Sequence, residues 1–414
     1  MKTTDRRNFL KGVSGAGVAS IGAAAPSFLD RAALAGESLR DRSNTDQNIL
    51  VLIQLEGGND GLNTVIPFSD PEYRRLRPGI AIGQVAGLKL DDQLSLHPAM
   101  TGMRGLFDDG HLSIVQGVGY PDPDRSHFRS MDIWNSARTG GANLAKDGWL
   151  GRALDLGAER EQGTTPALAI GSERLPLALV GSKVNVPMIR DLREFERRAG
   201  NGSRAERRRR QEALGELIAR PAETGSDLEF LRATAANSIA TAEKLETLGD
   251  SYKPATSYPA SALGRKLETV AQLITAEFGT RIFFVSLGGF DTHSKQEGAH
   301  QALLAELSAA VTAFGNDLRG HQLHDRVCLA TYSEFGRRAR ENGSLGTDHG
   351  TASQMFIAGP GGRGIVGEHP SLTDLDAEGD LKHHTDFRQV YATLLDTWLG
   401  IPSDQVLGRK YAHI

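Results

Sequence analysis

Short apolar runs alternate with longer segments of helical period along most of this chain, and this alternation limits the fold more than any other feature. The runs are rich in β-branched and aromatic residues, as at residues 49–55 and 326–332. Strands separated by helices are typical of a mostly parallel sheet that is covered by helices on both faces. The sequence therefore predicts an α/β fold, with ligands bound beyond the carboxyl ends of the strands.

The same patterns give approximate limits for each element. Strands are predicted at residues 49–55, 112–116, 167–170, 177–180, 281–287, 326–332 and 354–358. Helices are predicted at residues 99–107, 128–137, 261–278, 298–318 and 386–399. Residues 190–253 break the alternation, because they are dense in Arg and Glu and contain few strand formers. We expect a helical insertion or cap there, within a domain that spans residues 36–414.

The N-terminal segment has the layout of a twin-arginine export signal. Arg6 and Arg7 precede a weakly apolar run rich in Gly and Ala at residues 12–25, and residues 33–35 (ALA) offer a small-residue cleavage site. This layout predicts a signal over residues 1–35, recognition by the twin-arginine translocase, and a periplasmic or secreted protein. A permanent membrane anchor is the weaker alternative, since no run approaches the roughly 20 apolar residues that span a bilayer.

Overall charge excludes few partners but gives no sign of nucleic acid binding. The net charge is −4 and charged residues make up 24% of the chain, which is ordinary for a soluble protein. Four consecutive arginines at residues 207–210 are flanked by acids such as Glu206 and Glu212. We interpret this segment as a solvated, salt-bridged helix face, with binding of an anionic polymer as the alternative.

Carboxylate and imidazole side chains follow several predicted strands at the point where each strand ends. Asp60 and Asn63 follow residues 49–55 in a glycine-rich turn, and Asp291 and His293 follow residues 281–287. A further Asp-His pair, Asp348 and His349, comes after residues 326–332 and is flanked by glycines. Carboxylates and imidazoles in such positions can hold divalent metals. For Asp60 and Asn63, a role in forming the turn is the alternative.

Ser126 stands where a loop ends and a predicted helix begins. It could cap that helix, or it could act as a nucleophile favoured by the helix dipole and by a nearby metal. His127 is not expected to be its base, because neighbouring residues on a helix point to different faces. Glu334 and Arg337 could bind substrate, support the metal ligands or pair with each other, and His384 could complete a ligand set.

Taken together, these motifs resemble the alkaline phosphatase and sulfatase superfamily. The closer resemblance is to a broad bacterial family of twin-arginine-exported proteins, placed in that superfamily as a domain of unknown function, and it covers residues 49–400. The segments that carry it are residues 57–63, 125–127, 289–293, 333–337, 346–350 and 385–388. The resemblance implies an alkaline phosphatase-like fold.

The resemblance also implies a role for each matching residue. Asp60, Asp348 and His349 would hold one divalent ion, and Asp291, His293 and His384 a second, as zinc or as calcium or magnesium. Ser126 would be the nucleophile. Arg125, Arg337 and Asn63 would bind substrate, with Glu334 behind the ligands. The spacing of Asp291 and His293 is shorter than the Asp-x-x-x-His of the phosphatases.

The function predicted on this basis is metal-dependent hydrolysis of a phosphate or sulfate ester, with a small molecule or a polymer as substrate. Two clamped cations would stabilise the attacking and leaving oxygens while Ser126 forms a covalent intermediate. A non-catalytic envelope protein that keeps the fold and binds a polymer or protein partner is the alternative. A serine hydrolase without metal is a third, but the chain has no Gly-x-Ser-x-Gly motif.

Overall fold

The computed structural model describes residues 48–140, 145–157, 165–172, 174–189 and 252–414. These residues contain a large sheet of nine strands and a smaller sheet of three. Eight strands of the large sheet follow one another in the order β11 (Arg363–Val366), β5 (Leu112–Gly119), β10 (Ser353–Ala358), β9 (Val327–Tyr332), β1 (Ile49–Glu56), β8 (Ile282–Gly288), β6 (Ala167–Ile170) and β7 (Met188–Ile189). The ninth, β12 (Thr385–Asp386), pairs with β5.

The large sheet is mostly parallel. Strand β1 lies between β8 and β9 and is parallel to both. Among the described strands of this sheet, β10 alone runs the other way, antiparallel to β9 and to β5. Parallel strands at the centre of such a sheet are buried on both faces, which explains the unbroken apolar run of β1. The α/β prediction is confirmed.

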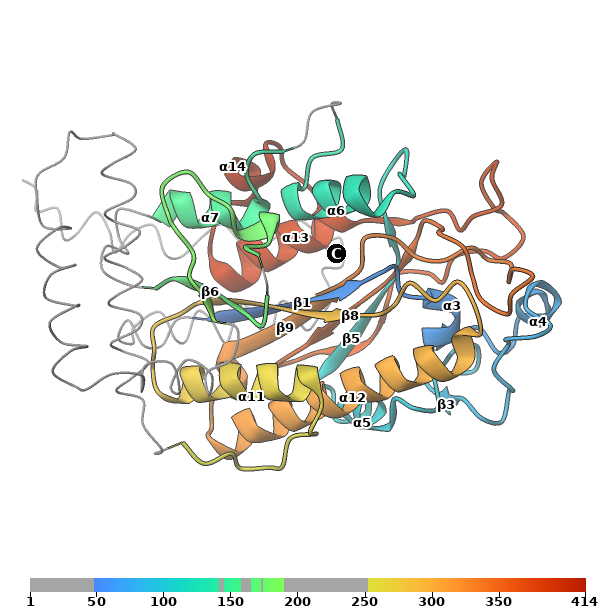
Figure 1. The fold of residues 1–414 in the computed structure, drawn as a ribbon, viewed down its shortest axis with the longest axis horizontal. Coiled ribbons are helices and arrows are strands. Elements are labelled where there is room, and N and C mark those ends of the chain that lie inside the picture. Colours follow the sequence, from blue (N-terminus) through green and yellow to red (C-terminus); the bar gives the residue numbers. More distant parts are fainter. Residues whose placement is uncertain (1–47, 141–144, 158–164, 173, 190–251) are drawn as a thin grey trace, which may run out of the picture.

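Helices cover both faces of the large sheet (Figure 1). Leu50 and Leu52 of β1 face one layer, whereas Val51 and Ile53 face the other. The first layer consists of α6 (His127–Ser136), α7 (Trp149–Gly157), α13 (Phe387–Thr393), the π-helical turn η5 (Leu394–Leu399) and α14 (Ser403–Leu407). The second consists of α5 (Thr101–Asp108), α11 (Ala262–Thr275) and α12 (Gln296–Gly320).

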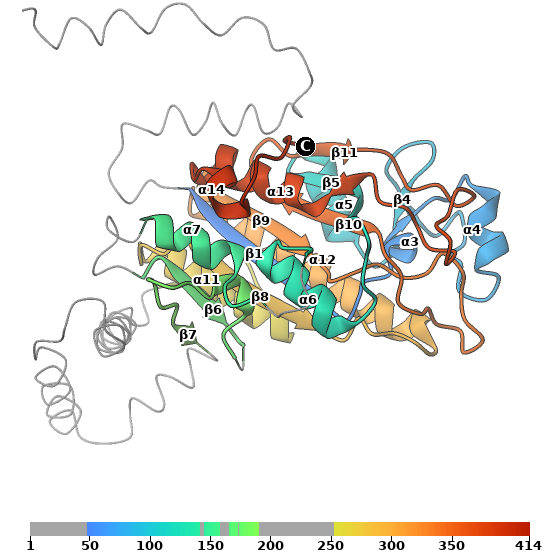
Figure 2. The same ribbon diagram turned by 90° about the horizontal axis from the view of Figure 1, so that it is seen from above.

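A smaller subdomain lies at the end of the molecule away from α7 (Figures 1 and 2). It consists of the short helices α3 (Gly61–Thr64) and α4 (Pro71–Leu76) and the antiparallel strands β2 (Val65–Ile66), β4 (Ser95–Leu96) and β3 (Leu88–Lys89). Asp70 caps α4 by accepting a hydrogen bond from the Glu72 amide at 2.9 Å. This subdomain brings Arg77, the residue after α4, into contact with Asp60, in the segment that follows β1.

Most predicted elements are present, with limits shifted by at most three residues, and one is wrong. The run predicted as a strand at 177–180 is the 3-10 helix η2 (Leu177–Leu179). Its apolar character reflects burial, since Ala178 and Leu179 are inaccessible to solvent. The Leu179 amide donates to the Pro176 carbonyl and closes a tight turn. A second 3-10 helix, η4 (His324–Arg326), precedes β9.

Two predictions concern residues outside the described ranges. The export signal at 1–35 is one, and the helical insertion, as far as residue 251, is the other. Within the described ranges, no helix is both long and apolar enough to cross a membrane.

Candidate metal centre

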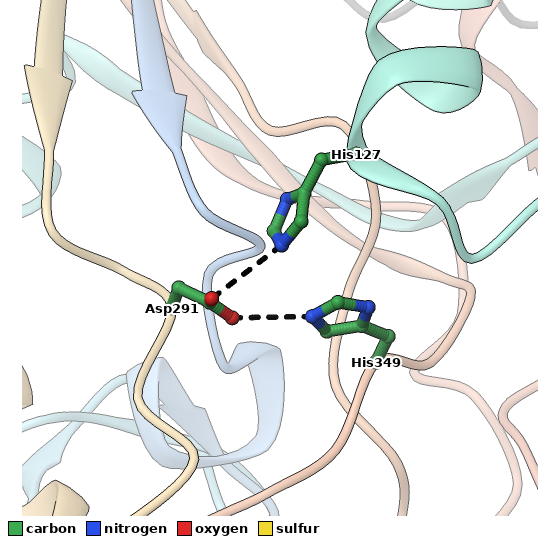
Figure 3. A group of neighbouring side chains, drawn as sticks. All are labelled: His127, Asp291 and His349. Atoms are coloured by element: carbon green, nitrogen blue, oxygen red, sulfur yellow. Dashed lines mark hydrogen bonds and ion pairs between the residues drawn. The ribbon is translucent and has the colours of Figure 1, made fainter.

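The sheet brings four loops to one edge. Strands β1, β5, β8 and β9 are parallel, so their carboxyl ends lie together, and β10 begins at the same edge because it is antiparallel. Asp291 follows β8, His349 lies between β9 and β10, and His127 opens α6 after β5. Figure 3 shows these three side chains pointing toward one another. With His293 they form what we call the ligand cluster.

Three atoms of the ligand cluster form a nearly equilateral triangle. Oδ1 of Asp291 lies 3.0 Å from Nε2 of His293 and 3.1 Å from Nε2 of His349. The two Nε2 atoms are 2.9 Å apart. Ligands that share one ion at bond lengths of about 2.0–2.1 Å lie roughly 2.9–3.4 Å from each other. The triangle therefore has the size of one face of a coordination sphere.

The hydrogen bonds behind the two histidines aim their lone pairs at this triangle. Nδ1 of His349 donates to the backbone carbonyl of Arg125 at 2.8 Å, and Nδ1 of His293 lies 3.2 Å from Oδ1 of Asp348. A neutral imidazole that donates through Nδ1 presents a lone pair at Nε2, which is the usual arrangement of a metal-bound histidine. Burial lowers the pKa of His349 and so favours its neutral form. A cation among the three acceptors would remove their mutual repulsion.

His127 extends the ligand cluster and is supported in the same way. Its Nδ1 lies 2.9 Å from Oε1 of Glu334, and its Nε2 lies 3.5 Å from Oδ2 of Asp291. One ligand atom each from His127, Asp291 and His349 falls within 4.8 Å of the other two. Glu334 is 1% exposed and also accepts the Gly57 amide at 2.8 Å. His127 can therefore serve as a fourth ligand, with Glu334 fixing its orientation.

The carboxylates of Asp291 and Asp348 are ionised at neutral pH. Partial burial of Asp291 opposes ionisation, but the hydrogen bond and the charge of Arg337 outweigh it and lower the pKa to about 2. Asn342 donates to Oδ1 of Asp348 at 3.1 Å, and this bond is the main cause of the lowered pKa of Asp348. The negative charge that a divalent cation needs is thus present.

Asp60 and Asn63 lie in the interior, apart from the ligand cluster. Asp60 is inaccessible to solvent, and its Oδ2 lies 2.6 Å from the Arg77 guanidinium. Burial opposes its ionisation, yet the charge and hydrogen bond of Arg77 keep its pKa below the usual value. Asn63 accepts from Arg77 at 2.9 Å and from Tyr73 at 2.8 Å, and it donates to the Ile80 carbonyl at 2.9 Å. These contacts use the hydrogen-bonding groups of Asn63 within the protein.

The two arginines expected to bind substrate already have protein partners. The buried guanidinium of Arg337 donates to the carbonyls of Gly58, Thr347 and Phe290 at 2.7–3.0 Å, and to Asp291 at 2.7 Å. It therefore ties three loops together. Arg125, which is partly exposed, pairs with Asp380 at 2.5 Å and with Asp376 at 3.4 Å.

Ser126 and His384 occupy different surroundings. Ser126 is exposed at the N-terminus of α6, and its hydroxyl makes no capping hydrogen bond. It lies between Arg125, whose carbonyl holds His349, and His127. His384 lies against Gly117 of β5, where its amide donates to the Gly117 carbonyl at 2.8 Å.

The structure thus brings together Asp291, His293, Asp348 and His349, with Glu334 behind them, and adds His127, which sequence reasoning did not place at the site. The available signal was its position at the end of the loop after β5, at the same sheet edge as Asp291. The helical spacing that argued against a role as base for Ser126 did not exclude a metal ligand.

Comparison with known families identifies the chain. Residues 47–409 match the family model described as "Protein of unknown function (DUF1501)". The chain belongs to this family. The resemblance to a family known as a domain of unknown function is confirmed for this DUF1501 protein, and the match includes every residue of the ligand cluster. No functionally curated protein matches the sequence.

Solved structures similar to this DUF1501 protein share little sequence with it. The sulfatase PsFucS1 from Pseudoalteromonas sp. is 10% identical, with 94% of this chain and 75% of that chain covered and a TM-score of 0.40. Alkaline phosphatase from the Antarctic bacterium TAB5 is 8% identical, with 86% and 99% covered and a TM-score of 0.35. A Vibrio parahaemolyticus protein in the alkaline phosphatase superfamily is 10% identical, with 94% and 78% covered and a TM-score of 0.37. At this similarity no residue role transfers to this chain.

Proposed function

We propose that this protein is a metal-dependent hydrolase of a phosphate or sulfate ester, with Ser126 as the nucleophile. The observation that carries the proposal is the triangle of Asp291 Oδ1, His293 Nε2 and His349 Nε2, with edges of 2.9–3.1 Å. Each histidine has its Nδ1 held by a separate acceptor, as metal-bound histidines do. Ser126, next to His127 in the sequence, has an exposed hydroxyl that makes no capping hydrogen bond to α6.

The donor set supports one tightly held ion of the zinc type. Imidazole nitrogens favour first-row ions such as zinc over calcium or magnesium. A bound ion would supply charge that polarises the ester and lowers the pKa of a nearby hydroxyl. Because Asp60 is paired with Arg77 and His384 lies by Gly117, we assign neither to this ion. The two-ion arrangement implied by the family resemblance therefore reduces here to one ion.

Ser126 would carry the covalent step. Its Oγ would bond to phosphorus or sulfur, the ester bond would break, and the alcohol would leave with a proton. Water would then cleave the serine ester and restore the hydroxyl. The helix dipole at the start of α6 would favour the negative charge that develops on the transferred group. Arg337 and Asn63 would act by holding the loops, whereas the partly exposed Arg125 could contact the substrate's anionic group.

Export is part of the proposal. The twin-arginine signal at residues 1–35 would route a folded protein through the translocase, so an ion bound at the ligand cluster before export could travel with it. The protein would then act on esters in the periplasm or outside the cell.

The test combines elemental analysis with an ester screen on the purified protein. We expect about one tightly held ion in the wild type, loss of that ion in Asp291→Asn, and loss of hydrolysis with the ion retained in Ser126→Ala. Activity that survives in Ser126→Ala would contradict the nucleophile. A retained ion without hydrolysis of any phosphate or sulfate ester would favour the non-catalytic envelope protein.

A further inference from the structure

We infer that Gln296, the first residue of α12, is a positioning residue that sets the distance between the two ligand-bearing loops. The inference rests on the proposed metal centre but assigns a residue that does not touch the ion. The two loops are residues 290–293 and 346–349, which supply Asp291, His293 and His349.

Each loop has an outward and an inward side. Asp291, His293 and Asp348 are 48%, 42% and 53% exposed. The threonines next to them, Thr292 and Thr347, are buried. These exposed fractions place Asp291, His293 and Asp348 on the solvent side of their loops and the two threonines on the interior side.

The Gln296 side chain joins the inward sides of both loops. Its Oε1 accepts from the Thr347 hydroxyl at 2.6 Å and lies 3.2 Å from the Thr292 hydroxyl. The two loops also meet directly, because the Thr347 amide donates to the Thr292 carbonyl at 3.3 Å. Gln296 is inaccessible to solvent, so water cannot replace these bonds when they are lost.

The other end of the Gln296 amide is fixed by a buried ion pair. Its Nε2 donates to Oδ2 of Asp60, the same oxygen that contacts Arg77. Arg77 also donates to the carbonyls of Ala339 at 3.0 Å and Arg338 at 2.8 Å, in the segment that leads to Asp348. Asp60, Asn63, Arg77 and Gln296 form what we call the buried cluster. It gives Asp60 a supporting function in place of direct metal binding.

The start of α12 is held rigidly enough for this purpose. Lys295 adopts a left-handed conformation with φ of 46°. Its amide donates to the Ser344 carbonyl, and the Gln296 amide donates to the Leu345 carbonyl, each at 2.9 Å. The helix that follows is 25 residues long. Gln296 thus projects from a fixed point between the two loops, and its loss should change the triangle rather than the fold.

The experiment measures Zn²⁺ affinity by competition with a chromophoric chelator, using full-length wild type, Gln296→Met and Thr347→Val. We expect Gln296→Met to weaken binding by about 10–100-fold, the usual effect of removing a group that orients metal ligands. Thr347→Val keeps the side-chain shape and should weaken binding in the same direction even if Gln296→Met does not fold. The Co²⁺-loaded variants should also show altered visible absorption, which a loss of stability alone would not produce.

Gln301→Met is the matched control, because Gln301 lies exposed on the same helix, and its Zn²⁺ affinity should equal that of the wild type. In the double variant Gln296→Met/Thr347→Val, the loss should match that of Gln296→Met alone. Wild-type affinity and Co²⁺ absorption in Thr347→Val, or in a folded Gln296→Met, would overturn the inference while leaving the proposed hydrolase intact. If both variants bound Zn²⁺ more weakly than the wild type, but the wild type hydrolysed no ester, the inference would hold and the proposed hydrolase would be overturned. No Zn²⁺ binding by the wild type would overturn both.

Discussion

Two aspartates follow neighbouring parallel strands, yet they have opposite surroundings. Asp60 comes four residues after β1 and is sealed against Arg77, whereas Asp291 comes three residues after β8 and is 48% exposed among three imidazoles. Both side chains touch an arginine and both have a lowered pKa. The difference comes from Arg77, 17 residues beyond Asp60, and from His127 and His349, which distant parts of the chain bring to Asp291. The position of a carboxylate at a strand end therefore does not by itself identify a metal ligand, because its neighbours decide whether it can bind an ion.

Breaking the buried cluster should have the largest effect. Arg77→Met leaves the buried charge of Asp60 without its partner, along with three other oxygens that accept from the guanidinium. Removing one member of a buried ion pair typically costs about 3–5 kcal/mol. We expect a loss of that size in the free energy of unfolding, measured by chemical denaturation.

The double variant Asp60→Leu/Arg77→Met tests whether the uncompensated charge is the cause. It should be more stable than Arg77→Met, because apolar replacement of a buried pair is often close to neutral. Equal destabilisation in the two variants would mean that the backbone contacts of Arg77 matter more than its charge.

Breaking the ligand cluster should act on metal affinity instead. His349→Ala removes one corner of the triangle, and we expect Zn²⁺ affinity to fall by more than about 100-fold, beyond the effect of losing an outer partner. Because the ring is partly exposed, the free energy of unfolding of the metal-free protein should change far less than in Arg77→Met. Isothermal titration with Zn²⁺ measures the affinity, and chemical denaturation of metal-free His349→Ala and Arg77→Met compares their free energies of unfolding.

His413→Ala is the control for His349→Ala, since this exposed histidine near the C-terminus pairs with Asp396. Its Zn²⁺ affinity should remain at the wild-type value. If His349→Ala and His413→Ala bound Zn²⁺ equally well, the ligand cluster would not be the metal centre.

A smaller effect is expected behind His127. Glu334→Gln keeps an oxygen that can accept from His127 and from the Gly57 amide, but it removes the negative charge. We expect Zn²⁺ affinity to fall by about tenfold, the low end for groups that orient a ligand. A fall as large as that in His349→Ala would instead indicate that Glu334 binds the ion itself.

How far the sequence could lead differs between the sheet and the site. Strands β1, β8 and β9 were predictable because burial on both faces gives unbroken apolar runs, whereas β7 and β12 have two residues each and leave no such pattern. The positions of the strand ends indicated where polar side chains would meet. They could not show that Arg77 would form an ion pair with Asp60, or that His127 would contact Asp291. Those outcomes depend on contacts between residues 17 and 164 positions apart.

The smallest effect concerns the titration of Asp291 in the metal-free protein. Its pKa is about 2 in the folded state against an ordinary value of 3.8, so its carboxylate stabilises the fold fully above pH 3.8. That contribution is lost as the pH falls toward about 2. Because the side chain is half exposed, solvent screening should keep it below about 1 kcal/mol. Asp291→Asn cannot titrate, so the stability advantage of the wild type over this variant should shrink between pH 5 and pH 2.5. Urea denaturation with chelator present measures both proteins, and each other carboxylate contributes equally to the two. An advantage that stayed constant over this range would mean that Arg337 does not hold the Asp291 charge in solution.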